Sequence, residues 1–234
     1  MGLLTDRRRY MNPNGYEFID IGSSVLWCTC NIGAENPWDY GWYFMWGDTT
    51  AYKSDRTPVG GGEAISFDWS NYPLCNGSED TMIKYCTNPD YGIVDNKTTL
   101  EPEDDAAHVH IGGGARMPTS EDFTELEYYC RKTWVTNYND TGVEGMLYTR
   151  YSDSSKKLFF PVTGELDGAE YNYFKESGKI WWNRVNLSGY GLDQSQSFKG
   201  MYWFFYLYDD YYPENYSVPK ERYIGMPIRA VLPK

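Results

Sequence analysis

The sequence has little positive charge and no long hydrophobic run. It holds 21 Lys and Arg against 33 Asp and Glu, a net charge of −12. No apolar stretch is long enough to span a bilayer, and the early Arg7-Arg8-Arg9 follows a short apolar stub, the reverse of a secretory signal. We therefore expect cytoplasmic synthesis, no membrane insertion and no nucleic-acid partner.

Groups that catalyse reactions or bind metal ions are also scarce. The two histidines, His108 and His110, have no third ligand at a suitable spacing, and we interpret them as surface or helix-end residues. No Gly-x-Ser-x-Gly motif is present. We expect no enzymatic activity, no metal and no cofactor. With no CxxC spacing, free and mostly buried thiols are expected at Cys28, Cys30, Cys75, Cys86 and Cys130.

Length and composition predict one folded domain of the α+β class. The hydrophobic fraction of 41% is typical of folded proteins. The 23 Tyr and 23 Gly favour short strands and many turns over helical bundles. We expect a tail or attachment segment over residues 1–13 and a domain over residues 14–234.

Local patterns predict two helices among antiparallel strands. Thr119 is a natural N-cap with Asp122 three residues later, and an apolar stripe follows. The stripe consists of Phe123, Leu126, Tyr129 and Cys130. An earlier helix is expected from Pro102 to His108, ending before Gly112. Expected strands cover about 16–21, 40–50, 143–148, 158–161, 180–182, 202–208 and 227–232, and residues 51–92 read as loops.

The C-terminal fifty residues are crowded with Tyr, Trp and Phe among small polar side chains. Such a mixture gives large contact area at low entropic cost, as in antibody paratopes. The run from Tyr202 to Tyr206 places bulky rings on both faces of a strand, and a domain has only one inside. The segment therefore favours a surface that grips another macromolecule.

A series of short motifs runs through the chain in a fixed order. They are Tyr16-Glu17-Phe18-Ile19-Asp20-Ile21-Gly22, Leu26-Trp27, Thr29-Cys30-Asn31-Ile32-Gly33-Ala34, Trp46-Gly47-Asp48-Thr49-Thr50, Arg116-Met117-Pro118-Thr119, Phe159-Phe160-Pro161-Val162 and Ile228-Arg229. In this order they resemble the C-type-lectin-fold domains abundant in gut bacteria and their phages, distant relatives of formylglycine-generating enzyme. The resemblance covers about residues 14–233.

The resemblance implies a C-type lectin fold, in which two helices flank antiparallel sheets and the N- and C-terminal strands pair. The strand at Phe18–Ile21 would then lie beside the strand at Ile228–Leu232. The late segment would form an exposed face. The formylglycine-generating relatives need a reactive cysteine pair late in the chain, and this chain has none after Cys130.

Many members of this fold are variable proteins of diversity-generating retroelements. In these, a C-terminal stretch is rewritten at adenine-containing codons while fixed residues hold the fold. The resemblance implies a variable binding region at about residues 180–227. The implied frame residues are Trp182, Leu207, Arg222, Gly225, Ile228 and Arg229. The implied contact residues are Asn183, Arg184, Asn186, Gln194, Gln196, Trp203, Phe205, Tyr208, Asp210, Tyr212, Asn215, Lys220 and Tyr223.

The resulting prediction is a receptor-binding protein displayed on a phage tail. Its partner would be a cell-surface protein or glycan. A homo-oligomer is expected, with a trimer suggested by analogy with phage fibres. Removing Trp203 or Tyr212 is expected to abolish binding without lowering the melting temperature.

Three alternatives stay open. The first is a fixed structural or adhesive module of a bacterial surface assembly. The second is an enzyme that uses the carboxylates of residues 101–105, although acids at a helix N-terminus explain them without further function. The third is calcium-dependent sugar binding, since Glu101-Pro102-Glu103 and Tyr138-Asn139-Asp140 come near the motifs of sugar-binding lectins.

Overall fold

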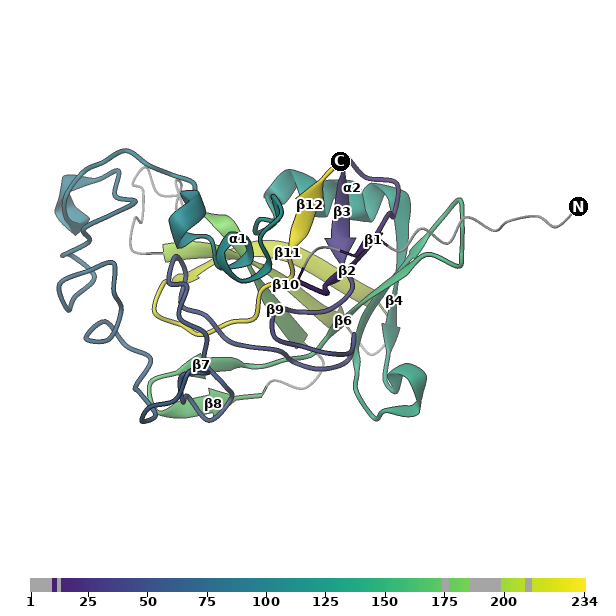
Figure 1. Cartoon of the computed structure of the whole chain (residues 1–234), viewed down its shortest axis with the longest axis horizontal. Coiled ribbons are helices and arrows are strands. Elements are labelled where there is room, and N and C mark those ends of the chain that lie inside the picture. The colour runs from purple at the N-terminus through teal and green to yellow at the C-terminus, as the bar shows by residue number, and fades with distance from the viewer. Residues whose placement is uncertain (1–9, 12–13, 174–176, 186–198, 209–211) are drawn as a thin grey trace, which may run out of the picture.

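The computed structural model describes residues 10–11, 14–173, 177–185, 199–208 and 212–234. It is a mixed α/β structure of mostly antiparallel sheets with two α-helices (Figure 1). The helices are α1 (Ala106–Ile111) and α2 (Ser120–Tyr129), and short 3-10 turns cover Pro89–Tyr91, Pro102–Asp104 and Tyr138–Asp140. The strands are β1 (Tyr10–Met11), β2 (Glu17–Ile19), β3 (Val25–Cys28), β4 (Cys130–Val135), β5 (Gly145–Arg150), β6 (Lys157–Pro161), β7 (Glu165–Asp167), β8 (Glu170–Asn172), β9 (Ser177–Val185), β10 (Lys199–Tyr208), β11 (Tyr212–Glu221) and β12 (Val231–Pro233).

The first sheet joins the two ends of the chain in the order β1-β2-β3-β12. The C-terminal strand pairs antiparallel with β3, with Val231 opposite Trp27. The expectation that the strand at Phe18–Ile21 is its direct neighbour is wrong, because β3 lies between β2 and β12. The wider expectation, that N- and C-terminal strands pair, is confirmed.

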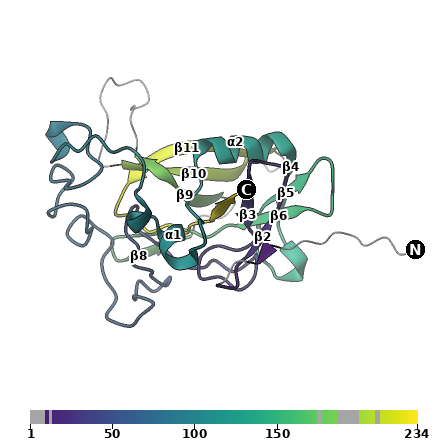
Figure 2. The ribbon, with the colours of Figure 1, turned by 45° about the horizontal axis from the view of Figure 1, so that its top comes forward.

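Two three-stranded sheets form the rest of the framework. One has the order β11-β10-β9 and the other β4-β5-β6. Helix α2 contacts β4 and β5, and Figure 2 shows it along one side of the molecule above these strands. A two-stranded ladder, β7-β8, is joined to the C-terminal segment by the hydrogen bond from the Leu166 N–H to the Gly225 carbonyl, 2.9 Å long.

The start of α2 is fixed by the capping box that the sequence predicts. The Thr119 hydroxyl accepts from the Asp122 N–H, and the Asp122 carboxylate accepts from the Thr119 N–H. The earlier helix begins later than expected. Pro102–Asp104 is a 3-10 turn, and α1 starts only after Asp105, whose carboxylate caps it.

Residues 40–100 contain no extended strand in the structure, so the strand expected over residues 40–50 is wrong. Tyr43 and Phe44 form single bridges to Tyr52 and Met226 instead. The loop-rich character expected after residue 50 is confirmed. This segment has a small core of its own, which includes Tyr72, Cys75 and Met82.

The sheet β9–β10–β11 lies between the two larger cores. The core beneath α2 contains Phe123, Phe160 and Trp203. The other contains Trp46, Trp181 and Tyr202, on the opposite side of β10. All five cysteines are free and buried, as expected.

Candidate functional site

Strand β10 exposes alternate side chains to different environments. Trp203 and Phe205 are 6% and 1% exposed and belong to the core beneath α2. Phe204 and Tyr206 point to the other face and are only half-buried. Tyr202, on the same face as Phe204, is 6% exposed and belongs to the other large core, so this face becomes accessible only from Phe204 onward. We call the face of Trp203 and Phe205 the inward side, and the part of the other face at Phe204 and Tyr206 the outward side.

The inward side is tightly packed. The Trp203 ring stacks on Phe123 of α2 with centroids 4.5 Å apart and planes 7° apart. Gly178 of β9 lies opposite Phe205, and a Cβ at this glycine would come 2.1 Å from the Phe205 ring. The glycine thus leaves the space in which that ring lies.

The outward side carries a cluster of three rings. Phe204 and Tyr206 are stacked at 5.3 Å with planes 22° apart. Tyr216 of β11 is paired in register with Phe204 and lies 5.3 Å from it and 5.8 Å from Tyr206. Tyr216 is 46% exposed. We call Phe204, Tyr206 and Tyr216 the outer ring cluster.

A buried carboxylate links the two strands that flank β10 on this side. The Glu165 side chain of β7 lies 2.6 Å from the Lys179 ammonium of β9 and 3.6 Å from the Lys220 ammonium of β11. Burial lowers the pKa of Lys179, and the Glu165 charge opposes that shift. The arrangement fixes both outer strands next to the rings.

Two buried arginines, Arg222 and Arg229, fix the segment that follows β11. The Arg222 guanidinium donates to the carbonyls of Tyr85 at 2.6 Å and Lys84 at 3.1 Å, over the Trp46 ring. The Arg229 guanidinium donates to the Thr29 carbonyl at 2.7 Å. Burial lowers the pKa of both arginines. Each is thus bound mainly through backbone carbonyls of distant loops.

The expected frame residues lie inside the protein where the structure describes them. Trp182, Arg222, Ile228 and Arg229 are all buried. A Cβ at Gly225 would come 2.6 Å from the Phe67 ring, so a glycine is required there. The side chain of Leu207 lies outside the described residues.

Three expected contact residues are buried, which corrects the prediction for them. Trp203 and Phe205 are core residues because β10 turns its odd-numbered side chains inward. Asn183 is also buried, and its backbone is held by Leu100 and Pro118. Trp203 is therefore expected to contribute to stability and not to a contact surface.

Three further contact candidates are partly exposed. The Asn215 amide bridges Glu127 of α2 and Lys132 of β4 at 2.8 and 2.9 Å. Lys220 pairs with Glu165, as described above. Tyr223 packs edge-on against Trp69 with centroids 4.8 Å apart, and burial raises its pKa to about 12.

The remaining candidates lie outside the described residues in whole or in part. Asn186, Gln194, Gln196 and Asp210 are not described. Arg184, Tyr208 and Tyr212 have a described backbone, in β9, β10 and β11 respectively, but their side chains are not described.

The sequence-based prediction of contact residues does not include Phe204, Tyr206 or Tyr216, the three rings of the outer ring cluster. Phe204 and Tyr206 alternate with Trp203 and Phe205 in an unbroken aromatic run, so periodicity alone does not distinguish the two faces. Gly178 leaves the space for Phe205, but this follows from the pairing of β9 with β10 and cannot be read from the sequence. Glu165 gave no signal, because it is far from its lysine partners in the sequence.

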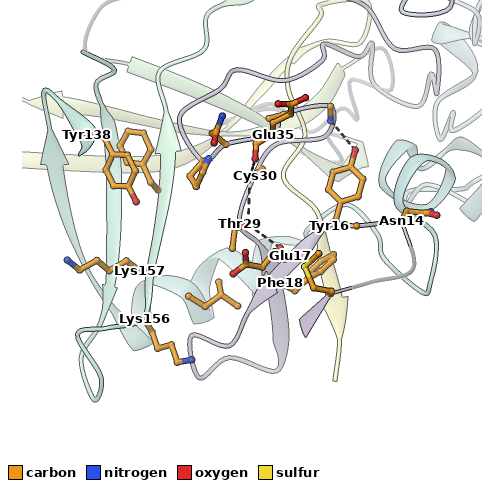
Figure 3. A pocket seen from close by; sticks show the side chains of 18 of the residues that line it. Asn14, Tyr16, Glu17, Phe18, Thr29, Cys30, Glu35, Tyr138, Lys156 and Lys157 are labelled. Atoms are coloured by element: carbon orange, nitrogen blue, oxygen red, sulfur yellow. Dashed lines mark hydrogen bonds between the residues drawn. The ribbon is translucent and has the colours of Figure 1, made fainter. Parts of the chain in front are cut away.

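A cleft of about 960 Å³ lies elsewhere, between the β2–β3 region and β6 (Figure 3). Figure 3 shows Thr29 and Glu17 on one side and Tyr138 and Lys157 on the other. Tyr138 stacks on Phe159 in its wall with centroids 4.0 Å apart and planes 4° apart. The volume is in the range of small-molecule sites.

The acidic group at residues 101–105 makes structural contacts. The Asp105 carboxylate accepts from the N–H groups of Ala107, His108 and Met117. Lys84 pairs with Asp104 and with Glu101, the latter at 2.7 Å. Charge placement at a helix start thus accounts for Asp105, as expected.

The two histidines end helix α1. His108 is exposed, and the His110 Nε2 lies 2.7 Å from the Thr49 carbonyl oxygen, between the rings of Trp42 and Phe44. Among the described residues, no group of three or more His, Cys, Asp or Glu could hold a metal ion. The described part of the chain also contains no helix that could cross a membrane.

Compared with protein-family models, with curated proteins and with solved structures, the chain gives no match. The candidate site is therefore defined by its geometry: a buried inward side, a partly exposed outer ring cluster, and the buried Glu165 carboxylate that pairs with Lys179 and Lys220.

Proposed function

We propose that this chain is a receptor-binding protein with a C-type lectin fold, and that the outer ring cluster is part of its binding surface. The pairing of β12 with β3 and the packing of α2 over antiparallel strands support this fold. The receptor is a protein or glycan on a cell surface.

The observation that carries the proposal is the contrast between the two sides of β10. A strand that only built a core would bury all its large rings, as β10 does with Tyr202 on the outward face. Here Tyr206 and Tyr216 are left partly in water, while Trp203 and Phe205 are sealed beneath α2. Exposed tyrosines on a rigid support provide contact area without a large ordering cost on binding.

The contacts that hold this sheet in place do not involve the side chains of the outer ring cluster. Glu165 ties β9 to β11, and Arg222 and Arg229 anchor the chain after β11 through carbonyl groups that are present whatever the side chains are. Substitutions at the outer ring cluster would therefore leave these anchors intact. We accordingly propose a target of a diversity-generating retroelement, carried on a phage tail after cytoplasmic synthesis.

Sequencing the gene and its flanks deeply in a growing population tests this function. We expect a nearby template copy and substitutions at codons within about residues 180–227, all at positions where the template has adenine. Within β10, changes should appear at Phe204 and Tyr206 and spare Trp203 and Phe205, which serve as internal controls.

A uniform segment without a template copy would overturn the retroelement assignment. The alternative would then be a fixed structural or adhesive module of a bacterial surface assembly, which uses the same face for one partner. Substitutions spread evenly over inward and outward residues would contradict the division of β10 into a support and a binding side.

A further inference from the structure

The sequence contains two Asn-Gly pairs and one Asp-Gly pair. They are Asn14-Gly15, Asn76-Gly77 and Asp167-Gly168. In such a pair the glycine nitrogen can attack the carbonyl carbon of the preceding side chain, because the glycine has no Cβ to obstruct the approach. The product is a five-membered succinimide ring. Whether the reaction proceeds depends on what holds the atoms that must meet.

Two of the three pairs are held by a hydrogen bond at an atom that would react. The Asn14 amide nitrogen, which would have to leave, donates to the Ile111 carbonyl at 2.6 Å. The Gly168 nitrogen, which would have to attack, donates to the Phe67 carbonyl at 2.8 Å, within a bridge between these two residues. Reaction at either pair therefore requires a local opening that breaks its hydrogen bond.

The third pair, Asn76-Gly77, is far less restrained. Both residues are exposed, and a Cβ at Gly77 would meet no atom within 4 Å. The Asn76 side-chain amide makes no hydrogen bond within the part of the chain that the structure describes. The Gly77 N–H lies within hydrogen-bonding range of the Cys75 sulfur, which is only a weak acceptor. The leaving group is thus open to solvent and the attacking nitrogen is held only weakly.

The backbone around this pair is fixed on both sides. The pair belongs to the loops of residues 70–100, at one end of the molecule (Figures 1 and 2). The Asn76 N–H donates to the carbonyl and to the hydroxyl of Thr81, both at 3.1 Å. Cys75 is 8% exposed, forms a bridge with Met82 and donates from its thiol to the Trp69 carbonyl at 3.3 Å. The exposed pair therefore follows directly on a buried cysteine.

We propose that Asn76 is a site of spontaneous modification, at which this asparagine is converted to aspartate and isoaspartate. The Gly77 nitrogen forms a bond to the Asn76 Cγ and gives up its proton, while the side-chain nitrogen gains a proton and leaves as ammonia. Water then opens the succinimide. Breaking the bond at Cγ leaves aspartate, and breaking the bond at the main-chain carbonyl carbon leaves isoaspartate. Ammonia leaves and water enters, so nothing is oxidised or reduced.

The isoaspartate product should open the loop around Cys75. It adds one carbon atom to the main chain between the N–H of residue 76, which Thr81 holds, and the Gly77 N–H beside the Cys75 sulfur. A main chain longer by one atom cannot keep both contacts at their present geometry. We therefore expect the Cys75 thiol to become accessible. This modification lies apart from the outer ring cluster and does not depend on the proposed receptor.

Ageing of the purified full chain at mildly alkaline pH, followed by digestion and mass spectrometry, is the first test. The peptide that contains Asn76 should gain the mass difference between an amide and an acid and separate into two products. The reaction at Asn76 should be at least about tenfold faster than at Asn14, because the fold holds the Asn14 amide. In urea the two rates should converge. Equal rates in the native protein, or an Asn76 that does not change, would overturn the proposal.

Asn76→Gln is the matched variant. It keeps the amide but lengthens the side chain by one carbon, so ring closure would have to give a six-membered ring. We expect no mass change at residue 76 over the same time. A change that persists in Asn76→Gln would show that the mass gain comes from another residue. Circular dichroism and thermal melting establish that the variant is folded.

Alkylation of Cys75 tests the structural consequence. The thiol should react at least about tenfold faster in the isoaspartate fraction than in fresh protein, because thiol reactivity requires access. Aged Asn76→Gln should react like fresh protein. Asn76→Asp carries the charge of the aspartate product on a main chain of normal length, and it should also leave Cys75 protected. Rapid labelling in Asn76→Asp, or a protected Cys75 in the isoaspartate fraction, would contradict the link between the lengthened main chain and the thiol.

Discussion

The inward and outward sides of the sheet β9–β10–β11 use the same kinds of residue under different constraints. On the inward side, Trp203 is stacked on Phe123, and Gly178 leaves room for Phe205. On the outward side, Phe204, Tyr206 and Tyr216 contact one another, and Phe204 also packs against the core that contains Tyr202. Aromatic content therefore says little about function until the partners of each ring are known. A ring enclosed on all sides supports the fold, whereas a ring with one open side is available for a partner.

The largest expected effect is the loss of an inward ring. Trp203→Ala should lower the free energy of unfolding by about 3–5 kcal/mol, because it leaves a cavity against Phe123. Tyr206→Ala, its outward counterpart, should cost about 1 kcal/mol or less. Urea denaturation of both variants measures the difference. Equal losses in the free energy of unfolding would mean that the inward and outward rings contribute equally to stability, which would contradict the division of β10 into two sides.

Removing the buried carboxylate should have the next largest effect. Glu165→Ala leaves the Lys179 ammonium buried without its 2.6 Å partner, which should cost about 3 kcal/mol. Combining it with Lys179→Met should recover much of that loss, since no buried charge remains unpaired. A double variant less stable than Glu165→Ala would show that the pair does not act as a unit. The measurement is again urea unfolding.

A smaller effect is expected from one added methyl group. Gly178→Ala places a Cβ 2.1 Å from the Phe205 ring and should destabilise the protein by about 1–3 kcal/mol. Gly60→Ala is the matched control, because no atom lies within 4 Å of a Cβ there. Thermal melting compares the two. Adding Phe205→Leu should relieve part of the Gly178→Ala penalty, and an unchanged penalty would place the clash elsewhere.

The smallest effect is chemical and reports on access to the inward side. Burial in the core with Trp203 raises the pKa of the Cys130 thiol to about 11. A raised pKa keeps the thiol protonated, so at pH 8 only about 0.1% is the reactive thiolate. Alkylation of Cys130, followed by mass spectrometry of its peptide, should be slow in the native protein. The alkylation rate of Cys130 should rise with pH up to about 11. At any one pH the rate should be higher in Trp203→Ala than in the unmodified protein, because loss of the ring opens the core around the thiol. Rapid labelling at pH 8 in the unmodified protein would contradict a closed inward side.

Local chemistry made part of this structure predictable from sequence. The Thr119 and Asp122 side chains satisfy backbone groups within one turn, so their pattern alone located the start of α2. The resemblance predicts that strands from the two chain ends pair. It does not predict which N-terminal strand lies next to β12, because β2 and β3 carry similar apolar patterns. The strand expected over residues 40–50 failed because Tyr43 and Phe44 find single partners in distant loops instead of a ladder.

The site was harder to predict than the fold. In the run from Tyr202 to Tyr206 every residue is aromatic, so the usual alternation of polar and apolar residues is missing. Which side faces the core depends on partners far away in sequence, such as Phe123 and Glu165. Nothing local to β10 contains that information, so the sequence-based prediction places Trp203 and Phe205 among the contact residues.

The most direct test of the central claim is a saturation library of residues 199–221, displayed on cells and sorted for resistance to protease. We predict that Trp203 and Phe205 tolerate only large apolar substitutes, while Phe204, Tyr206 and Tyr216 accept polar and charged residues with little loss. Such a profile would show one side that supports the fold and another that is free to vary. Equal intolerance on both sides of β10 would contradict the account, because no face of this sheet would then be available to change with its receptor.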